Sequence, residues 1–87
     1  MILRVYSRPT CHLCVEAKEK VERVGRRYGL PVEVVNIDGS AELLERFQRR
    51  IPVVELDGEE LGWGRISEKG LSHAIEKRTR GADDPPR

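Results

Sequence analysis

The 87-residue sequence predicts an α/β fold with the element order βαβαββα, in which a four-stranded mixed sheet is flanked by helices on both faces. Three observations support this prediction. The hydrophobic period changes from strand-like to helix-like and back within residues 2–37, which indicates a βαβ unit. A second helical stretch and an Asp-Gly hairpin signal at 57–58 follow. One more amphipathic stretch then predicts a final helix.

The first three elements are expected to form a parallel strand–helix–strand unit. Residues 2–6 are a β-branched and aromatic run that favours a strand. Apolar residues recur at spacings of four and three over residues 12–28, which predicts a helix capped by Thr10 and ended by Gly29. The buried stripe of this helix is expected to consist of Leu13, Ala17, Val21, Val24 and Tyr28. Residues 32–37 are the second strand, joined to the first by a right-handed crossover.

The second half of the chain is expected to add a helix, a hairpin and a last helix. Residues 41–48 carry apolar side chains on one side and predict the second helix. Residues 53–56 and 59–63 are the strands of the hairpin, joined by the Asp-Gly turn. Ser67 is expected to cap a last helix that ends near Arg78.

The chain is short enough for a single domain with a thin core. We assign residues 1–79 to that domain, because Gly81 follows the last amphipathic stretch. Residues 80–87 are expected to form a disordered polar tail. Since one core uses all the apolar stripes, we expect a monomer.

Charge and hydropathy narrow the expected partners and location. With 16 basic and 15 acidic residues, the net charge of +1 predicts neither a nucleic-acid partner nor a membrane partner. Residues 1–6 are too short and too charged for the apolar region of a signal peptide, and no run of about 18 apolar residues occurs. The expected location is therefore cytoplasmic. Two cysteines in a reducing compartment do not indicate a framework of structural disulfides.

The sequence Cys11-His12-Leu13-Cys14 is a C-x-x-C motif that follows the first strand and opens a helix. Unpaired backbone N–H groups and the helix dipole at such a position favour the thiolate, which is the nucleophilic form of cysteine. Two intervening residues let the two sulfurs meet within one helical turn. We therefore expect a redox-active disulfide, with Cys11 attacking a substrate disulfide and Cys14 resolving the mixed disulfide.

Other interpretations of the cysteines remain open at this point. Cys11 and Cys14 could be buried structural thiols. A closed zinc site needs four ligands, and beyond the cysteines the chain offers only His12 and His73, so we expect no metal ligand set in one chain. The protein could also carry an iron–sulfur cluster shared between two chains, or act as a redox-switched regulatory adaptor.

Residues 5–14, with the sequence Val-Tyr-Ser-Arg-Pro-Thr-Cys-His-Leu-Cys, resemble the active-site entry of glutaredoxins and of small bacterial glutaredoxin-like redoxins. Together with Ile-Pro-Val at 51–53, this motif is typical of the thioredoxin-like fold. The resemblance covers residues 2–78. It implies a dithiol oxidoreductase of cell redox homeostasis and electron transport, which reduces protein disulfides or glutathione-mixed disulfides and binds no resident cofactor.

The resemblance carries roles over to individual residues. Cys11 matches the nucleophile and Cys14 the resolving cysteine. Pro52 matches a cis-proline that faces the active site and leaves the backbone of Val53 free to pair with a bound thiol peptide.

Four further residues are expected near the substrate: Arg8, Thr10, His12 and Trp63. Arg8 stands where glutaredoxins often carry a cation that steadies the thiolate or meets a glutathione carboxylate, although a solvated loop arginine fits the sequence equally well. A charged His12 would favour a neighbouring thiolate, although an exposed histidine without a role fits the sequence equally well. Trp63 either contacts substrate or covers the thin core.

One stretch departs from the glutaredoxin pattern. Glutathione-using members carry a Gly-Gly pair followed by an acidic or hydroxyl residue, whereas Trp63 separates Gly62 from Gly64 here and no acidic residue follows. A Trp followed by Gly and Arg is weakly similar to redoxins that draw electrons from thioredoxin reductase. Glutathione and a reductase are therefore the two candidate electron donors.

Overall fold

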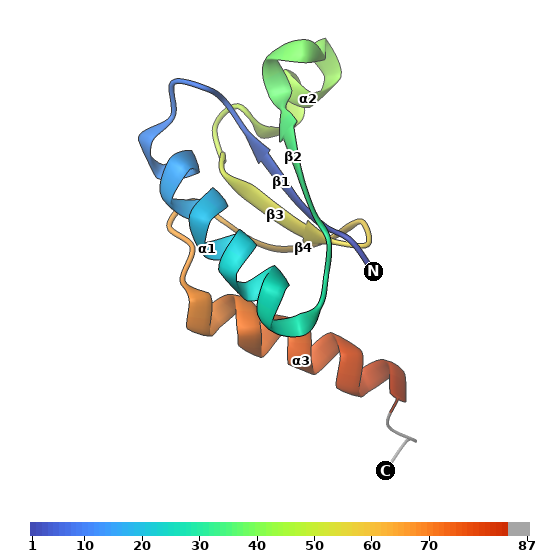
Figure 1. Ribbon diagram of the computed structural model, residues 1–87. Helices are drawn as coiled ribbons and strands as arrows, with labels where there is room; N and C mark the ends of the chain where they lie inside the picture. Colours follow the sequence, from blue (N-terminus) through green and yellow to red (C-terminus); the bar gives the residue numbers. More distant parts are fainter. Residues whose placement is uncertain (84–87) are drawn as a thin grey trace.

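The computed structural model describes residues 1–83, and its sheet and helices confirm the expected fold class (Figure 1). The elements follow in the order β1 (Leu3–Ser7), α1 (His12–Tyr28), β2 (Val32–Asn36), η1 (Ile37–Gly39), α2 (Ala41–Phe47), β3 (Val53–Leu56), β4 (Glu59–Trp63) and α3 (Glu68–Asp83). The strand order in the sheet is β2-β1-β3-β4. β1 pairs in parallel with β2 and antiparallel with β3, so it lies inside the sheet.

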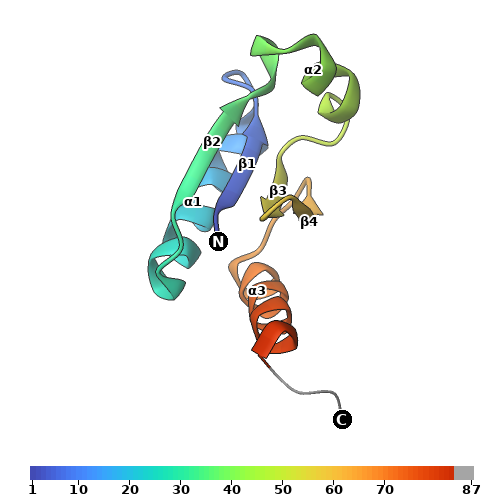
Figure 2. The ribbon, with the colours of Figure 1, turned by 90° about the vertical axis from the view of Figure 1, so that its right-hand side faces the viewer.

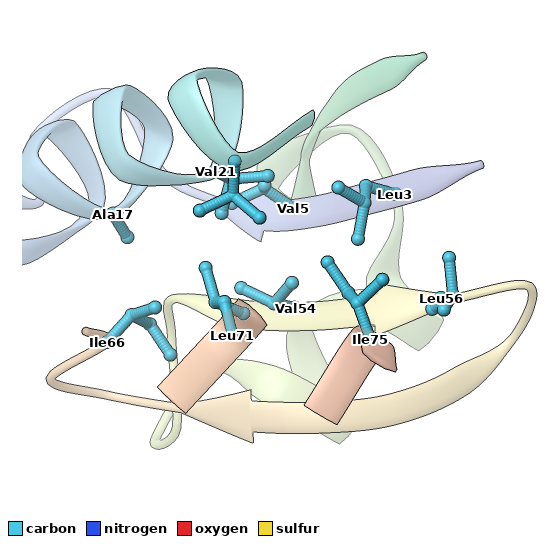
Figure 3. Packing of buried hydrophobic residues seen from close by; sticks show 10 residues of the cluster. Leu3, Val5, Ala17, Val21, Val54, Leu56, Ile66, Leu71 and Ile75 are labelled. Carbon is cyan, nitrogen blue, oxygen red and sulfur yellow. The ribbon is translucent and has the colours of Figure 1, made fainter. Parts of the chain in front are cut away.

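Alternation along β1 sends its side chains to two separate cores. Leu3 and Val5 join the larger cluster, in which α1 and α3 cover one face of the sheet (Figure 3). Tyr6 joins the smaller cluster on the other face, where α2 packs beside the carboxyl end of β2 (Figure 2). The Tyr6 ring stacks on Phe47 with 4.6 Å between centroids. Its hydroxyl donates to the buried Glu55 carboxylate at 2.9 Å.

Several expected boundaries shift by one residue, and one shifts further. β1 ends at Ser7, and Ile37 belongs to a short 3-10 turn rather than to β2. Ser67 caps α3 as expected, since its hydroxyl accepts from the Gly70 N–H at 3.0 Å. The expected end near Arg78 is wrong, because α3 continues to Asp83.

Gly81 lies within α3, so the described part of the expected tail, residues 80–83, is helical. A glycine in a helix lowers its stability by roughly 1 kcal/mol but does not end it unless the backbone turns left-handed. Residues 84–87 of the expected tail lie outside the described residues. None of the helices within residues 1–83 is long and apolar enough to cross a membrane.

Gly25 is a point of close approach between α1 and the segment that leads into β2. A Cβ atom at this position would lie 2.7 Å from a Val32 methyl carbon and 2.9 Å from the Leu30 carbonyl oxygen. Gly29 then ends α1 in a left-handed conformation with φ 67°, as predicted. The chain therefore reverses direction at Gly29, and the start of β2 packs directly against the end of α1.

Replacing Gly25 with Ala should destabilise the protein, although Ala is the better helix former. The added methyl meets a backbone carbonyl that cannot rotate away, and we expect a loss of about 2 kcal/mol in the free energy of unfolding. Urea unfolding followed by circular dichroism measures it. Gly39→Ala is the matched control, since an added Cβ there meets nothing within 4 Å. Equal stability of the two variants would contradict the close approach.

Candidate redox site

Cys11 is the residue that caps α1. Its backbone is extended, with φ −93° and ψ 114°, and its sulfur accepts a hydrogen bond from the Cys14 N–H at 3.2 Å. Thr10, which we expected to be the cap, instead lies exposed in the preceding turn. The correction favours the expected chemistry, because an N–H group of the first helical turn, that of Cys14, donates to the Cys11 sulfur.

Cys14 lies one turn further along α1 and is only 3% exposed. It occupies the buried side of the helix with Ala17, Val21 and Val24 at spacings of three, four and three. Leu13 was assigned to this stripe but is exposed, because adjacent helical residues point about 100° apart. Both cysteines are free thiols, and Cys11 is the more accessible of the two.

Burial is the largest cause that raises the pKa of the Cys14 thiol from 9.0 to about 12. The hydrogen bond with Cys11 and the charge of Cys11 act in the same direction, whereas a backbone hydrogen bond at Arg8 opposes them. Cys14 is therefore a protonated thiol at neutral pH. The two sulfurs differ in both exposure and environment, as nucleophile and resolving groups require.

Pro52 is the second part of the site, after the two cysteines of α1. The Ile51–Pro52 peptide bond is cis, in agreement with the resemblance. β3 starts at the next residue and runs antiparallel to β1, with Tyr6 opposite Val53. The amino end of β3 and the carboxyl end of β1 therefore meet at one end of the sheet, where Cys11 also lies.

The expected role of the Val53 backbone is wrong. Val53 is fully buried, and its strand has β1 on one side and β4 on the other. The Asp57 N–H donates to the Ile2 carbonyl at 3.1 Å, and hydrogen-bonded pairs alternate along an antiparallel ladder. This alternation pairs the Val53 backbone with Tyr6, so it is not free for a peptide. The Pro52 carbonyl is also engaged, since it accepts from the Gly64 N–H at 2.8 Å.

The Arg8 side chain forms an ion pair with an acidic side chain. Its Nε lies 2.9 Å from Oδ1 of Asp38, in the turn that follows β2. The Arg8 backbone, in contrast, is part of the site, because its carbonyl accepts from the Cys11 N–H at 3.2 Å. Sequence reasoning missed Asp38. The signal for it was its place directly after β2, since the carboxyl ends of parallel strands lie at the same edge of a sheet.

Trp63 and His12 are both accessible at this end of the molecule. Trp63 ends β4 opposite Val53 and is 53% exposed, so it does not cover the core. His12 is the first residue of α1 and is exposed. Within residues 1–83 no three His, Cys, Asp or Glu side chains are close enough together to hold a metal ion.

These features define a glutaredoxin-type protein of the thioredoxin-like class: a mixed four-stranded sheet, a Cys-x-x-Cys motif that opens α1, and a cis-proline at the same end. The chain belongs to the glutaredoxin-like domain family (DUF836), whose model matches residues 2–76. This family and this fold indicate a redox-type function.

Known proteins similar to this chain support the same class. The X-ray structure of protein XcR50 from X. campestris has a TM-score of 0.74 and 29% identity, covering 86% of this chain and 96% of that one. Uncharacterized protein Rv0508 of Mycobacterium tuberculosis is 28% identical, covering 97% of this chain and 90% of that protein. Thioredoxin 1 from Thermosipho africanus shares the fold with a TM-score of 0.73 at 16% identity, covering 97% of this chain and all of that one.

In the reduced native protein, iodoacetamide at about pH 8 should modify Cys11 at least roughly 100-fold faster than Cys14, because Cys14 is buried and protonated. Peptide mapping by mass spectrometry measures the two rates. In guanidinium chloride the rates should become similar, which is the control. Equal rates in the native protein would contradict the assignment of the two thiols.

The same raised pKa predicts how stability changes in alkali. The Cys14 thiol ionises at a lower pH in the unfolded chain than in the native protein. The native state should therefore lose stability as the pH rises from 9 toward about 12. Urea unfolding across this range, with Cys14→Ala as the control that lacks this ionisation, measures the effect.

Proposed function

We propose that this protein is a thiol–disulfide oxidoreductase that works through the dithiol Cys11 and Cys14. The observation that carries the proposal is the placement of the two sulfurs. Cys11 caps α1 and accepts the Cys14 N–H, while Cys14 is buried one turn behind it. Pro52 lies at the same end of the sheet, because it directly precedes β3, whose first residue pairs with Tyr6 of β1.

The reaction takes place in two exchanges. The Cys11 thiolate attacks one sulfur of the substrate disulfide, so a bond from Cys11 to substrate forms and the substrate S–S bond breaks. The departing substrate thiolate takes up a proton. Cys14 then loses its proton and attacks the Cys11 sulfur, which releases the second substrate thiol and closes the Cys11–Cys14 disulfide. Two electrons pass to the substrate, and a thiol reductant must reopen the disulfide.

The second exchange depends on the ionisation of Cys14. When Cys11 is held in a mixed disulfide, it carries no negative charge, so two of the causes that raise the pKa of Cys14 are removed. Burial remains and still disfavours the thiolate. Formation of the mixed disulfide therefore itself prepares Cys14 for attack.

The proposed substrates are protein disulfides or glutathione-mixed disulfides, and the proposed electron donor is glutathione or a thioredoxin reductase. A coupled assay with glutathione and glutathione reductase, run beside one with thioredoxin reductase, separates the donors. Activity with one system alone assigns the donor class.

Cys11→Ser should reduce disulfide reduction to the rate of buffer alone, since no other accessible thiol is present. Cys14→Ser should still attack but should accumulate the mixed disulfide, visible as a mass increase in non-reducing mass spectrometry. Near-normal turnover by Cys11→Ser would refute the proposal. A brown protein with visible absorbance after anaerobic purification would favour the cluster carrier instead.

A further inference from the structure

The charges of this nearly neutral chain are distributed unevenly between the two ends of the sheet. The topology brings four connecting segments together at the Cys11 end, 8–11, 37–40, 48–52 and 64–67. Their charged residues are Arg8, Asp38, Arg49, Arg50 and Arg65. The connections at the opposite end, 29–31 and 57–58, contain a single charged residue, which is Asp57. The connecting segments at the redox end therefore carry a net positive charge, while α2 at the same end adds Glu42, Glu45 and Arg46.

Two of the four arginines in these connecting segments are neutralised within the fold. Arg8 pairs with Asp38 at 2.9 Å, and Arg50 donates to both carboxylate oxygens of Glu60 at 3.0 Å. Arg49 and Arg65 are exposed and form no ion pair with any residue in the described part of the chain. Their charges are available to a bound molecule.

The backbone places both free arginines beside Pro52. Arg49 lies in the loop that leads into the cis bond, and Phe47 holds this loop by accepting from the Arg50 and Ile51 N–H groups at 2.8 and 3.1 Å. On the other side, the Gly64 N–H donates to the Pro52 carbonyl at 2.8 Å. Residues on both sides of Gly64 therefore lie next to the cis-proline.

Trp63 adds an exposed aromatic surface to these two cations. It precedes Gly64, is 53% exposed, and lines with Arg65 a surface hollow of about 180 Å³. An exposed indole has no role in the core, and aromatic residues beside arginines are typical of binding surfaces. We call Arg49, Trp63 and Arg65 the basic rim, because they belong to the two segments that flank Pro52, residues 48–51 and 63–65.

We propose that the basic rim selects disulfides in acidic peptide segments, in which carboxylates flank the sulfur atoms. This inference rests on the proposed function, whose reacting atoms lie at the same end of the sheet. The two arginines attract the carboxylates and raise the rate of encounter, and Trp63 packs on the peptide chain. Glutathione also carries carboxylates, so the experiment separates it from an acidic peptide.

The first experiment compares kcat/KM for three substrates: one disulfide peptide flanked by Glu, the same peptide flanked by Lys, and a glutathione-mixed disulfide of a neutral peptide. We expect the acidic peptide to exceed the basic one by about 10-fold at low salt, and the difference to vanish at about 0.5 M NaCl. Equal values for the acidic and basic peptides would overturn the inference. A preference for the glutathione substrate alone would overturn the acidic-peptide assignment.

Charge reversal identifies the residues responsible. The double variant Arg49→Glu with Arg65→Glu should lose the preference for the acidic peptide and gain one for the basic peptide. Arg26→Glu with Lys77→Glu is the matched control, with the same change in net charge on exposed residues of α1 and α3. The inference is wrong if the control pair changes the preference as much as the rim pair does.

A binding measurement keeps the inference testable if the protein proves to reduce no disulfide. Trp63 is the sole tryptophan of the chain, so its fluorescence reports directly on the rim. Titration with the acidic peptide in which both cysteines are replaced by Ser should change this fluorescence at low salt, and the basic peptide should not. Absence of a change with the acidic peptide would overturn the inference, whereas absence of turnover alone would overturn only the proposed function.

Discussion

The pairing of β1 with two different neighbours is the constraint on which the rest of the structure depends. Its parallel partner β2 requires a crossover, and that crossover is α1 with Cys11 at its start. Its antiparallel partner β3 begins with the residue that follows Pro52. Because both partners are registered against Leu3–Tyr6 of β1, the helix cap and the cis-proline are fixed at one end of the sheet.

The same sheet makes two chemically similar sulfurs different. α1 lies over the larger core, so its residues alternate between apolar packing and solvent with the helical period. Cys14 lies on the packed side and Cys11 lies before the first turn, where backbone donors are unpaired. A dithiol with one accessible and one protected sulfur therefore follows from helix geometry and needs no special catalytic side chain.

Local patterns in the sequence predicted the fold and the pair of cysteines, because period, turn chemistry and caps are properties of short segments. They failed where the outcome depended on contacts between distant segments. The free backbone expected at Val53 is used by Tyr6, and the side chain of Arg8 is taken by Asp38. Trp63 is exposed because β4 is an edge strand, and strand order is not visible in a local pattern.

Gly25 has a consequence for chemistry that takes place at the other end of α1. A helix of 17 residues is a stiff rod, and Gly25 lies in its last two turns, close to β2. A larger residue there would push the carboxyl end of α1 away from the segment that leads into β2. The helix would tilt on the sheet, and its amino end, which Cys11 caps, would move relative to Pro52. The absence of a side chain at Gly25 thus helps to fix the position of Cys11 at the other end of the helix.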